Sequence, residues 1–206
     1  MRILRASDRV ATPWKNGAGL TREVAVWPPG AGFEDFHWRI SLAEFDQDTS
    51  FSVFAGVDRL LTLLEGQLSL SFDDGREMKR AVRFSPLPFA GEIPVTGSVT
   101  AGPVLDLNVM TRRGVVNATV KRVRMAGALR LPSSPHTRIL FTRCSLRISE
   151  PLEAQLNRDD AFLLEPETPP VAVSAARGTV FLITLHSAQA STEVAHADLP
   201  GENTRR

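Results

Sequence analysis

The sequence predicts an all-β fold, either a β-sandwich or a barrel. Its apolar residues recur mostly with a period of two, which is the alternation of side chains along a β-strand. The runs are short, and Gly, Pro and Asp interrupt them. Asp74-Gly75 is typical of a hairpin turn, because these residues accept the positive φ that such a turn requires. Together, the period and the turn residues favour sheets over an α/β fold.

The expected strands are spread over the whole chain. In order, they are the runs 21–27, 36–43, 60–64, 67–72, 104–110, 137–148 and 179–186. Glu65-Gly66 is a second expected turn, between the third run and the fourth. A short helix is expected only at 7–10 or at 157–161, so we expect little helix.

An internal repeat suggests that the fold is duplicated. Residues 63–71 resemble residues 140–148, and each segment precedes a proline-rich connection and a final strand. Leu140 lies 77 residues after Leu63, and Val180 lies 76 residues after Val104. A repeat at a constant period indicates two similar units. We therefore expect an N-terminal barrel at 1–115 that carries a pocket, a C-terminal barrel at 116–198 and a frayed tail at 199–206, with the seam between residues 112 and 134.

Composition and charge exclude several classes of partner. The chain has 206 residues, enough to bury a core without disulfides or a structural metal. Its 24 basic and 23 acidic residues leave a formal charge of +1 at pH 7, so we expect no nucleic acid and no membrane as partner. The single cysteine, Cys144, excludes an intrachain disulfide. No apolar stretch approaches the roughly 20 residues that span a bilayer, and we expect a cytoplasmic protein.

Three of the expected strands carry polar residues on one face. The period of two groups Thr21 with Glu23, Asp106 with Asn108, and His37 with Arg39, Ser41 and Ala43. For a single strand, exposure to solvent explains such a face. Three strands without a lysine on that face favour instead a hydrogen-bonded polar interior or a pocket for a small polar ligand.

The second half of the chain provides an internal comparison. Where the first half has Asp106 and Asn108, the repeat places Leu182 and Thr184. We therefore expect only the N-terminal barrel to have kept a polar interior, with the C-terminal barrel as a scaffold.

The sequence contains no metal-binding pattern among its histidines. Imidazoles two residues apart on a strand can converge on one ion, usually with a carboxylate. The four histidines occur singly, as His37, His136, His186 and His196. We expect no metal and no cofactor. The Gly-x-Gly at 17–19 lacks the third glycine of a dinucleotide site, and we expect it to turn the chain past the barrel mouth, beside Trp14 and Asn16.

Six segments, taken in order, resemble the HutD/Ves family of bacterial proteins, within the cupin superfamily. They are 14–23, 36–43, 51–59, 63–66, 89–92 and 106–113. The chain departs from the family pattern in one loop, at Thr49-Ser50, where Gly-Pro is commoner, and at Ala55, where Pro is usual. The resemblance implies a bicupin, that is, two tandem cupin-type barrels or jelly rolls. It also implies an accessory role in histidine utilisation, such as sensing or limiting an intermediate.

The resemblance and the polar faces together indicate one set of candidate ligand-binding residues. They are Asn16, Thr21, Glu23, Arg39, Ser41, Ser52, Arg59, Asp106 and Asn108. Arg39 or Arg59 can clamp a carboxylate through two parallel N–H bonds. Glu23 or Asp106 can accept an N–H from an ammonium or an imidazole. The expected ligand is a small polar carboxylate, such as histidine, urocanate or an acylated glutamate.

Three functions remain open. The preferred one is a metal-independent protein that binds such a carboxylate for sensing or regulation. The second is a metal-independent isomerase or hydrolase with Glu23 or Asp106 as general base, for which a pKa raised by burial is the physical sign. The third is a structural homodimer, joined through an exposed sheet edge, with an inert polar core. In a purely structural network, Arg39 pairs with Glu23 or Asp106, and Arg59 pairs with Asp58 or a surface carboxylate.

Overall fold

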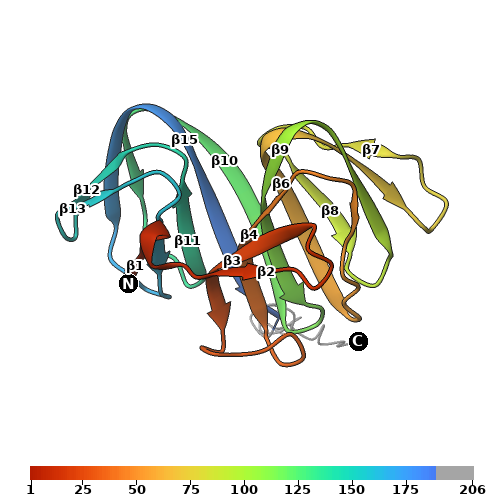
Figure 1. Ribbon diagram of the computed structural model, residues 1–206. Helices are drawn as coiled ribbons and strands as arrows, with labels where there is room; N and C mark the ends of the chain where they lie inside the picture. The colour runs from red at the N-terminus through yellow and green to blue at the C-terminus, as the bar shows by residue number, and fades with distance from the viewer. Residues whose placement is uncertain (189–206) are drawn as a thin grey trace, which may run out of the picture.

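The molecule consists of two antiparallel β-sheets that lie side by side, and the computed structural model describes residues 1–188 (Figure 1). Within those residues, the only helical element is a 3-10 turn, Ala6–Asp8. The predicted all-β fold is therefore confirmed. No helix in this part of the chain is long and apolar enough to cross a membrane. The tail expected at 199–206 lies outside the described residues.

The sheet of the N-terminal half has eight strands, in the order β2-β3-β4-β9-β6-β7, with β5 on β9 and β8 on β6. These strands are β2 (Ala11–Pro13), β3 (Gly19–Trp27), β4 (Trp38–Phe45), β5 (Thr49–Ser50), β6 (Val57–Phe72), β7 (Lys79–Arg80), β8 (Pro86–Ala90) and β9 (Val95–Arg112). A long antiparallel ladder joins β6 to β9. It brings side chains that are far apart in the sequence onto one surface.

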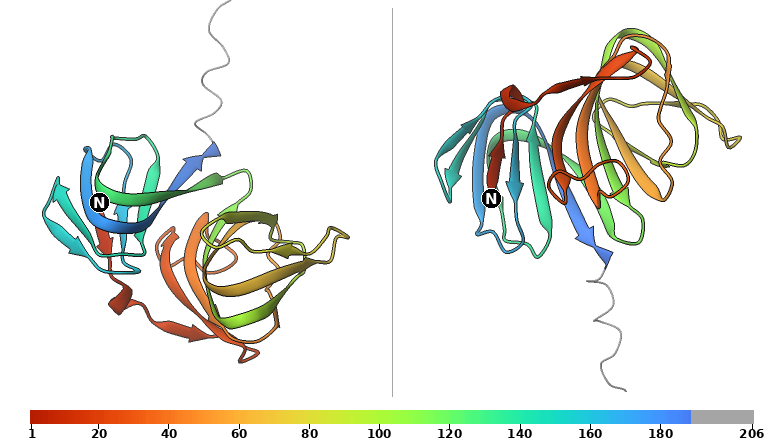
Figure 2. Two further views of the ribbon diagram at one scale, coloured as in Figure 1. Left: turned by 90° about the horizontal axis from the view of Figure 1, so that it is seen from above. Right: turned by 60° about the horizontal axis from the view of Figure 1, so that its bottom comes forward.

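The sheet of the C-terminal half has seven strands, in the order β1-β14-β11-β15-β12-β13, with β10 on β15. They are β1 (Arg2–Leu4), β10 (Val116–Leu131), β11 (Thr137–Thr142), β12 (Leu146–Glu150), β13 (Ala154–Leu156), β14 (Ala161–Leu164) and β15 (Val171–Ser187). The first strand of the chain therefore lies in this sheet, paired with β14 (Figure 2). Asp160 anchors the segment that follows β1, because its carboxylate accepts hydrogen bonds from Arg5 at 2.8 Å and from the Ala6 N–H at 2.7 Å.

Two of the expected strands are parts of a single strand in the structure, and another expected strand is divided into two. The runs 60–64 and 67–72 belong to β6, which shifts register at Glu65 but does not end there. The turn expected at Glu65-Gly66 is thus a bulge. Gly66 has a φ of +78°, and a Cβ at this position would lie 2.6 Å from the Pro103 carbonyl oxygen, so only glycine allows β6 to pass β9 so closely. The run 137–148 divides into β11 and β12.

The sequence pattern does not predict β10, which lies where we expected a connecting seam. This strand pairs with β15 along its length, from Val116 opposite Ser187 to Leu131 opposite Val171. Many of its side chains are exposed, among them Lys121 and Arg124. Because β10 carries so much charge, it lacks the apolar run by which a buried strand is recognised in a sequence. Pairing with the long strand β15 stabilises it.

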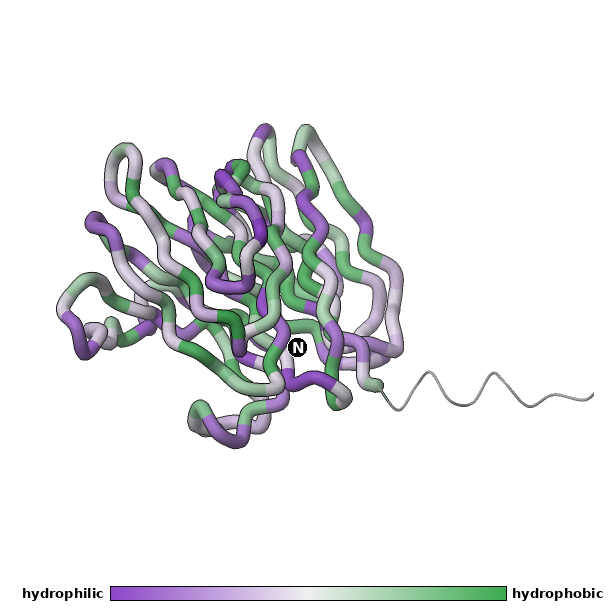
Figure 3. Tube along the Cα trace, turned by 90° about the vertical axis from the view of Figure 1, so that its right-hand side faces the viewer, coloured by the Kyte–Doolittle hydropathy of each residue, from purple (hydrophilic) through white to green (hydrophobic). Residues whose placement is uncertain are grey.

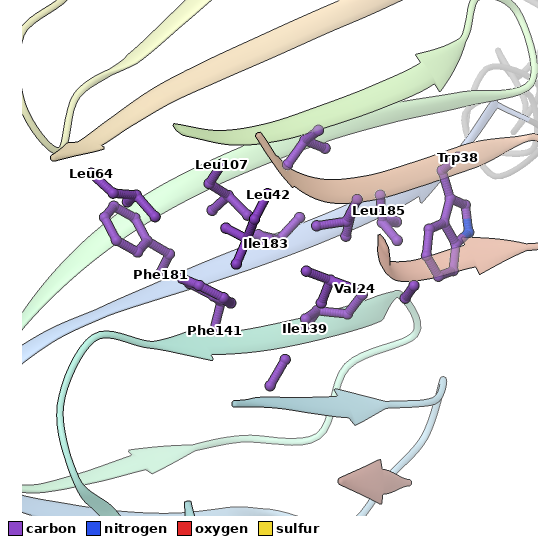
Figure 4. Packing of buried hydrophobic residues seen from close by; sticks show 14 of the residues in the cluster. Val24, Trp38, Leu42, Leu64, Leu107, Ile139, Phe141, Phe181, Ile183 and Leu185 are labelled. Carbon is purple, nitrogen blue, oxygen red and sulfur yellow. The ribbon is translucent and has the colours of Figure 1, made fainter. Parts of the chain in front are cut away.

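One apolar core joins the two sheets (Figure 4). From the N-terminal half, β3, β4 and β9 contribute Val24, Trp38, Ile40, Leu42, Leu107 and Val109. From the C-terminal half, β10, β11 and β15 contribute Val116, Ile139, Phe141, Phe181, Ile183 and Leu185. Full burial of a large apolar side chain contributes about 1.5–3 kcal/mol. The two halves are therefore held together by a core that neither possesses alone.

The same strands of the N-terminal half turn their other face toward its interior. Because side chains alternate, Ser41 and Asp106 lie on the opposite face from Leu42 and Leu107. Figure 3 shows this alternation as hydrophobic and hydrophilic segments that follow one another along the strands. The inner side has its own apolar cluster, which includes Phe45, Leu61, Leu63, Leu68, Leu70 and Phe89.

Ion pairs also bridge the two halves. Glu65 of β6 accepts hydrogen bonds from Arg143 and Arg158 of the C-terminal half. The Arg143 side chain is 3% exposed and also pairs with Asp159. These contacts therefore add a partly buried polar bridge between the halves to the apolar core that they share.

Replacing Phe181 by alanine should lower the free energy of unfolding by about 3–5 kcal/mol, because the ring has no exposed surface in the shared core. Urea denaturation measures this loss. Val82, which is 66% exposed, provides the control: Val82→Ala should change stability by less than about 0.5 kcal/mol. Equal effects of the two substitutions would contradict the shared core.

Candidate functional site

Strand register brings the polar faces onto one inner surface of the N-terminal half. Three adjacent rows of neighbours cross the sheet. They are Thr21, Ala43, Asp106 and Leu63; then Glu23, Ser41, Asn108 and Leu61; then Val26, Arg39, Met110 and Arg59. Neighbours in a row share a face, with Cβ atoms about 4.5–5.5 Å apart. All of the predicted site residues except Asn16 and Ser52 lie in these rows.

Arg59 is buried in this interior, with 7% of its surface exposed. Its Nε donates to Asn108 Oδ1 at 3.5 Å, and its Nη1 donates to the carbonyl oxygen of Ser52 at 3.3 Å. Both distances are long for a charged donor, whose hydrogen bonds to carboxylates are typically about 2.7–2.9 Å. The alternative pairing with Asp58 is wrong, because Asp58 pairs with Arg113 at 2.7 Å. Arg59 therefore has weak partners only.

Asp106 is the second buried charge, with 2% of its surface exposed. Its Oδ1 has no hydrogen-bond partner. Burial raises the pKa of Asp106 to about 7, although the positive charge of Arg59 opposes the shift. Burial likewise lowers the pKa of Arg59 to about 10. No ion pair joins the two side chains, although the charge of each acts on the pKa of the other.

Arg39, in contrast, is paired. Its Nη2 lies 2.9 Å from Glu23 Oε2, with side-chain exposures of 15% and 39%. Its guanidinium also stacks on Phe33, 4.5 Å from the ring centroid. This geometry matches the structural alternative for Arg39. Of the two arginines considered as a carboxylate clamp, Arg59 is the one whose charge is left without a carboxylate.

The remaining predicted residues lie at the edge of the interior. Asn16 is exposed, and its Nδ2 donates to Thr49 Oγ1 at 3.1 Å. Thr21 accepts a hydrogen bond from the Trp14 indole at 2.7 Å. Ser52 contributes its backbone carbonyl to Arg59, while Ser52 itself is exposed. These residues position the loops around the interior.

The sequence did not indicate the aromatic surroundings of Arg59. The ring centroids of Phe51, Phe54 and Phe89 lie 5.4, 5.8 and 4.9 Å from its Cζ. Such rings stabilise a guanidinium through their negative faces without neutralising its charge. Phe51 and Phe54 lie in the same segment as Arg59, and this clustering was the available signal.

The structure also corrects two expectations about the C-terminal half. His136 and His186 do not stand apart: their ring centroids are 4.4 Å apart, because β11 and β15 are neighbours. This half also has a buried polar residue on its inner face, Arg138, which is 6% exposed. Within residues 1–188, no three His, Cys, Asp or Glu side chains gather as metal ligands.

Two surface cavities lie beside the site rather than in it. One, of about 430 Å³, has Arg80, Arg83 and Leu63 in its lining, and Leu63 lies opposite Asp106 in the β6–β9 register. The other, of about 370 Å³, lies between the halves and is lined in part by Trp27 and Trp38. None of the nine predicted site residues lines either cavity.

Comparisons with known sequences give a family match over most of the chain. The HutD family model matches residues 6–183. An uncharacterized 21.2 kDa protein in the hutC 3' region of Pseudomonas putida is 33% identical over 145 residues, which cover 70% of this chain and 75% of that protein. Protein Ves of Citrobacter koseri is 40% identical over 109 residues, or 52% of this chain and 56% of that protein.

Solved structures agree with this match. HutD from Pseudomonas fluorescens SBW25, in a formate condition, has a TM-score of 0.77 at 28% identity, covering 90% of this chain and 98% of that one. A Cupin 2 conserved barrel domain protein from Leptotrichia buccalis has a TM-score of 0.56 at 9% identity, covering 86% and 91%. At that identity the similarity concerns the fold alone, which is cupin-like.

Asp106→Asn should change how stability depends on pH. The folded pKa of about 7 lies above the roughly 3.9 of an unfolded Asp, so the wild type should lose stability as the pH rises between these values. The variant cannot ionise there, so its free energy of unfolding should rise relative to the wild type, by an amount on the order of a few kcal/mol. Urea denaturation across this range measures the difference. A variant that loses stability relative to the wild type as the pH rises would contradict the raised pKa.

Proposed function

This chain belongs to the HutD family, and we propose that it binds a small carboxylate metabolite in the interior of its N-terminal half, as a sensing or regulatory protein associated with histidine utilisation. One observation carries the proposal. Arg59 and Asp106 are both buried in the same interior, yet they form no ion pair with each other. Buried charges are costly unless they are paired. A ligand with a carboxylate at one end and a polar group at the other would supply both partners.

The carboxylate end fits Arg59. A guanidinium carries five N–H donors, and Arg59 uses two of them in long hydrogen bonds. A carboxylate can accept two parallel N–H bonds from it and replace the weak contact with Asn108. The rings of Phe51, Phe54 and Phe89 cover the guanidinium and exclude water, which strengthens such a pair. Binding in this mode requires no metal ion, because Arg59 supplies the positive charge.

The second polar end fits Asp106 and Asn108. With a pKa of about 7, Asp106 is present both protonated and ionised near neutral pH. It can therefore donate a hydrogen bond to a carbonyl or accept one from an amide, an ammonium or an imidazole. Asn108 adds a carboxamide in the next row. Histidine, urocanate and the formyl and formimino derivatives of glutamate all combine a carboxylate with such a group.

The relatives support the association with histidine utilisation. One is named for its place in the hutC 3' region, and a solved structure of another is named HutD. We therefore expect the ligand among the intermediates of histidine breakdown.

A second candidate function, an isomerase or hydrolase, is favoured by one observation. The raised pKa of Asp106 is the property that a general base needs near neutral pH. In this reading Asp106 removes a proton from the substrate or from an attacking water, while Arg59 holds the carboxylate. Glu23 is the poorer base, because Arg39 already occupies its carboxylate at 2.9 Å.

Ligand binding should raise the temperature of unfolding. At about 100 times its dissociation constant, a ligand adds roughly 2.7 kcal/mol to stability. Histidine, urocanate, formiminoglutamate, formylglutamate, glutamate and formate should be compared by thermal unfolding. We expect at least one to shift the midpoint for the wild type and to lose this effect in Arg59→Met.

Arg147→Met serves as the matched control, since the Arg147 side chain is 62% exposed on the other half. This control should keep the full ligand response. If no compound shifts the wild type, or if Arg59→Met responds as the wild type does, the proposed pocket is wrong.

Turnover distinguishes the two candidate functions. Catalysis by Asp106 predicts conversion of the bound compound at a rate that rises with pH through about 7, as the base ionises. Asp106→Asn should then lower the rate by about 10²–10⁴-fold. The bound compound is followed by chromatography over long incubations. If it binds but stays unconverted, the sensing function is favoured.

A further inference from the structure

A second group of cationic side chains lies in the sheet of the C-terminal half. It consists of His136 and Arg138, at the start of β11, and His186 of β15. We propose that these three residues form a binding site for a small oxyanion, a group of the size and charge of sulfate, phosphate or a carboxylate. The inference is independent of the proposed function, because the two sites share no residue.

Strand register places the three side chains on one face. Arg138 lies opposite Thr184 in the β11–β15 pairing. One residue beyond the near end of that pairing, which is Thr137 opposite Leu185, the rings of His136 and His186 meet with centroids 4.4 Å apart. Since side chains alternate, this is the face that carries Leu140 and the rest of the inner core of this half, not the core shared between the sheets.

Arg138 is the buried member of the group. It is 6% exposed, and its Nη2 donates to the carbonyl oxygen of Pro132 at 2.7 Å. Its Nε is buried without any acceptor. Burial lowers the pKa of Arg138, and no neighbouring carboxylate counteracts the shift. A guanidinium in this position is only partly satisfied by one carbonyl, and an anion would supply the missing charge.

Burial and the neighbouring ring of His136 both oppose protonation of His186. Burial, and then the positive charge of His136, lower the pKa of His186. The Nε2 of His186 lies 3.4 Å from Thr119 Oγ1 of β10. Two adjacent imidazolium rings repel one another unless an anion lies between them. Binding of an oxyanion should therefore favour the protonated form of both.

The other groups around this face leave the positive charge unbalanced. On this face β10 adds Lys121, which is exposed, and β14 places Leu164 opposite Arg138. Glu165, the residue after β14, is paired with the N-terminal amine at 2.6 Å, and Glu167 is exposed. As far as the chain is described, no carboxylate pairs with Arg138, His136 or His186.

The donor set specifies an oxyanion rather than a cation. Arg138 offers N–H groups in a fixed planar array, and each protonated imidazole offers two more. Thr119 and Thr184 add hydroxyl groups, which can donate to a tetrahedral or a planar oxyanion. A metal ion would meet the repulsion of a permanently charged guanidinium.

Histidine titration by NMR tests the site directly on the full chain. The Cε1 protons are followed from about pH 5 to about pH 8, in sulfate and in chloride at equal ionic strength. Sulfate keeps its charge over this range. We expect sulfate to raise the pKa of His186 by about one unit, which corresponds to roughly tenfold tighter binding to the protonated form. The Cε1 proton of His37, which lies in the N-terminal half, is followed as the control.

Variants assign the effect to the cluster. Arg138→Met should abolish the sulfate-induced shift, whereas Arg147→Met, which removes an exposed arginine of the same sheet, should retain it. Should Arg138→Met not fold, His136→Asn replaces it, with the same loss expected at His186. Arg59→Met should keep the shift, which separates this site from the one in the N-terminal half.

Two results would overturn the proposal: His186 titrations that are the same in chloride as in each of sulfate, phosphate and formate, or an anion-induced shift that survives in Arg138→Met or His136→Asn. Repeating the titration with phosphate and with formate identifies the source of the anion. A shift with formate alone points to a carboxylate ligand, and a shift with sulfate and phosphate points to an inorganic oxyanion or a phosphoryl group. Either pattern supports the site.

Discussion

The apolar contact between the two sheets determines where polar chemistry can occur in this protein. Because β3, β4 and β9 bury one face against β10, β11 and β15, every second residue along them is committed to that core. A shift of one residue would move Asp106 into the core and Leu107 into the interior of the N-terminal half. The core thus fixes the register, and the register aligns the rows that contain Glu23, Asn108 and Arg59. Without that core, no packing contact would direct the polar faces toward the interior of the N-terminal half.

That alignment creates an electrostatic cost that the N-terminal half does not remove by itself. Glu23 compensates the charge of Arg39, but Arg59 has only two long hydrogen bonds to neutral oxygens, and Asp106 Oδ1 has no hydrogen-bond partner. A large shared core can sustain such a cost, since folded proteins retain only a small net stability from large opposing terms. Selection for stability alone would favour an ion pair or an apolar replacement at these positions. The proposed ligand site rests on this lack of an ion pair at Arg59 and Asp106.

The sequence predicts the fold class and the polar faces well, because both follow from a period of two. It also identifies the family, whose model spans residues 6–183. It does not predict β10, where charged exposed residues conceal the strand, or the placement of β1 in the second sheet, which depends on pairing with a strand 160 residues later. It likewise cannot tell which arginine is paired. Arg39 and Arg59 have similar local patterns, and only the positions of Glu23 and Phe51 in space distinguish them.

Asp106 is a buried carboxyl group whose Oδ1 has no hydrogen-bond partner, and the proposed ligand would supply one. The most direct test is to follow the Asp106 side-chain carboxyl carbon by ¹³C NMR as the pH is varied, with and without the ligand that binds most tightly. We expect a pKa near 7 in the free protein, because burial disfavours the ionised carboxylate, and a clear displacement of that value when the ligand occupies the interior. Titration in the ordinary range of an exposed aspartate, about 3.5–4, unchanged by any ligand, would contradict it.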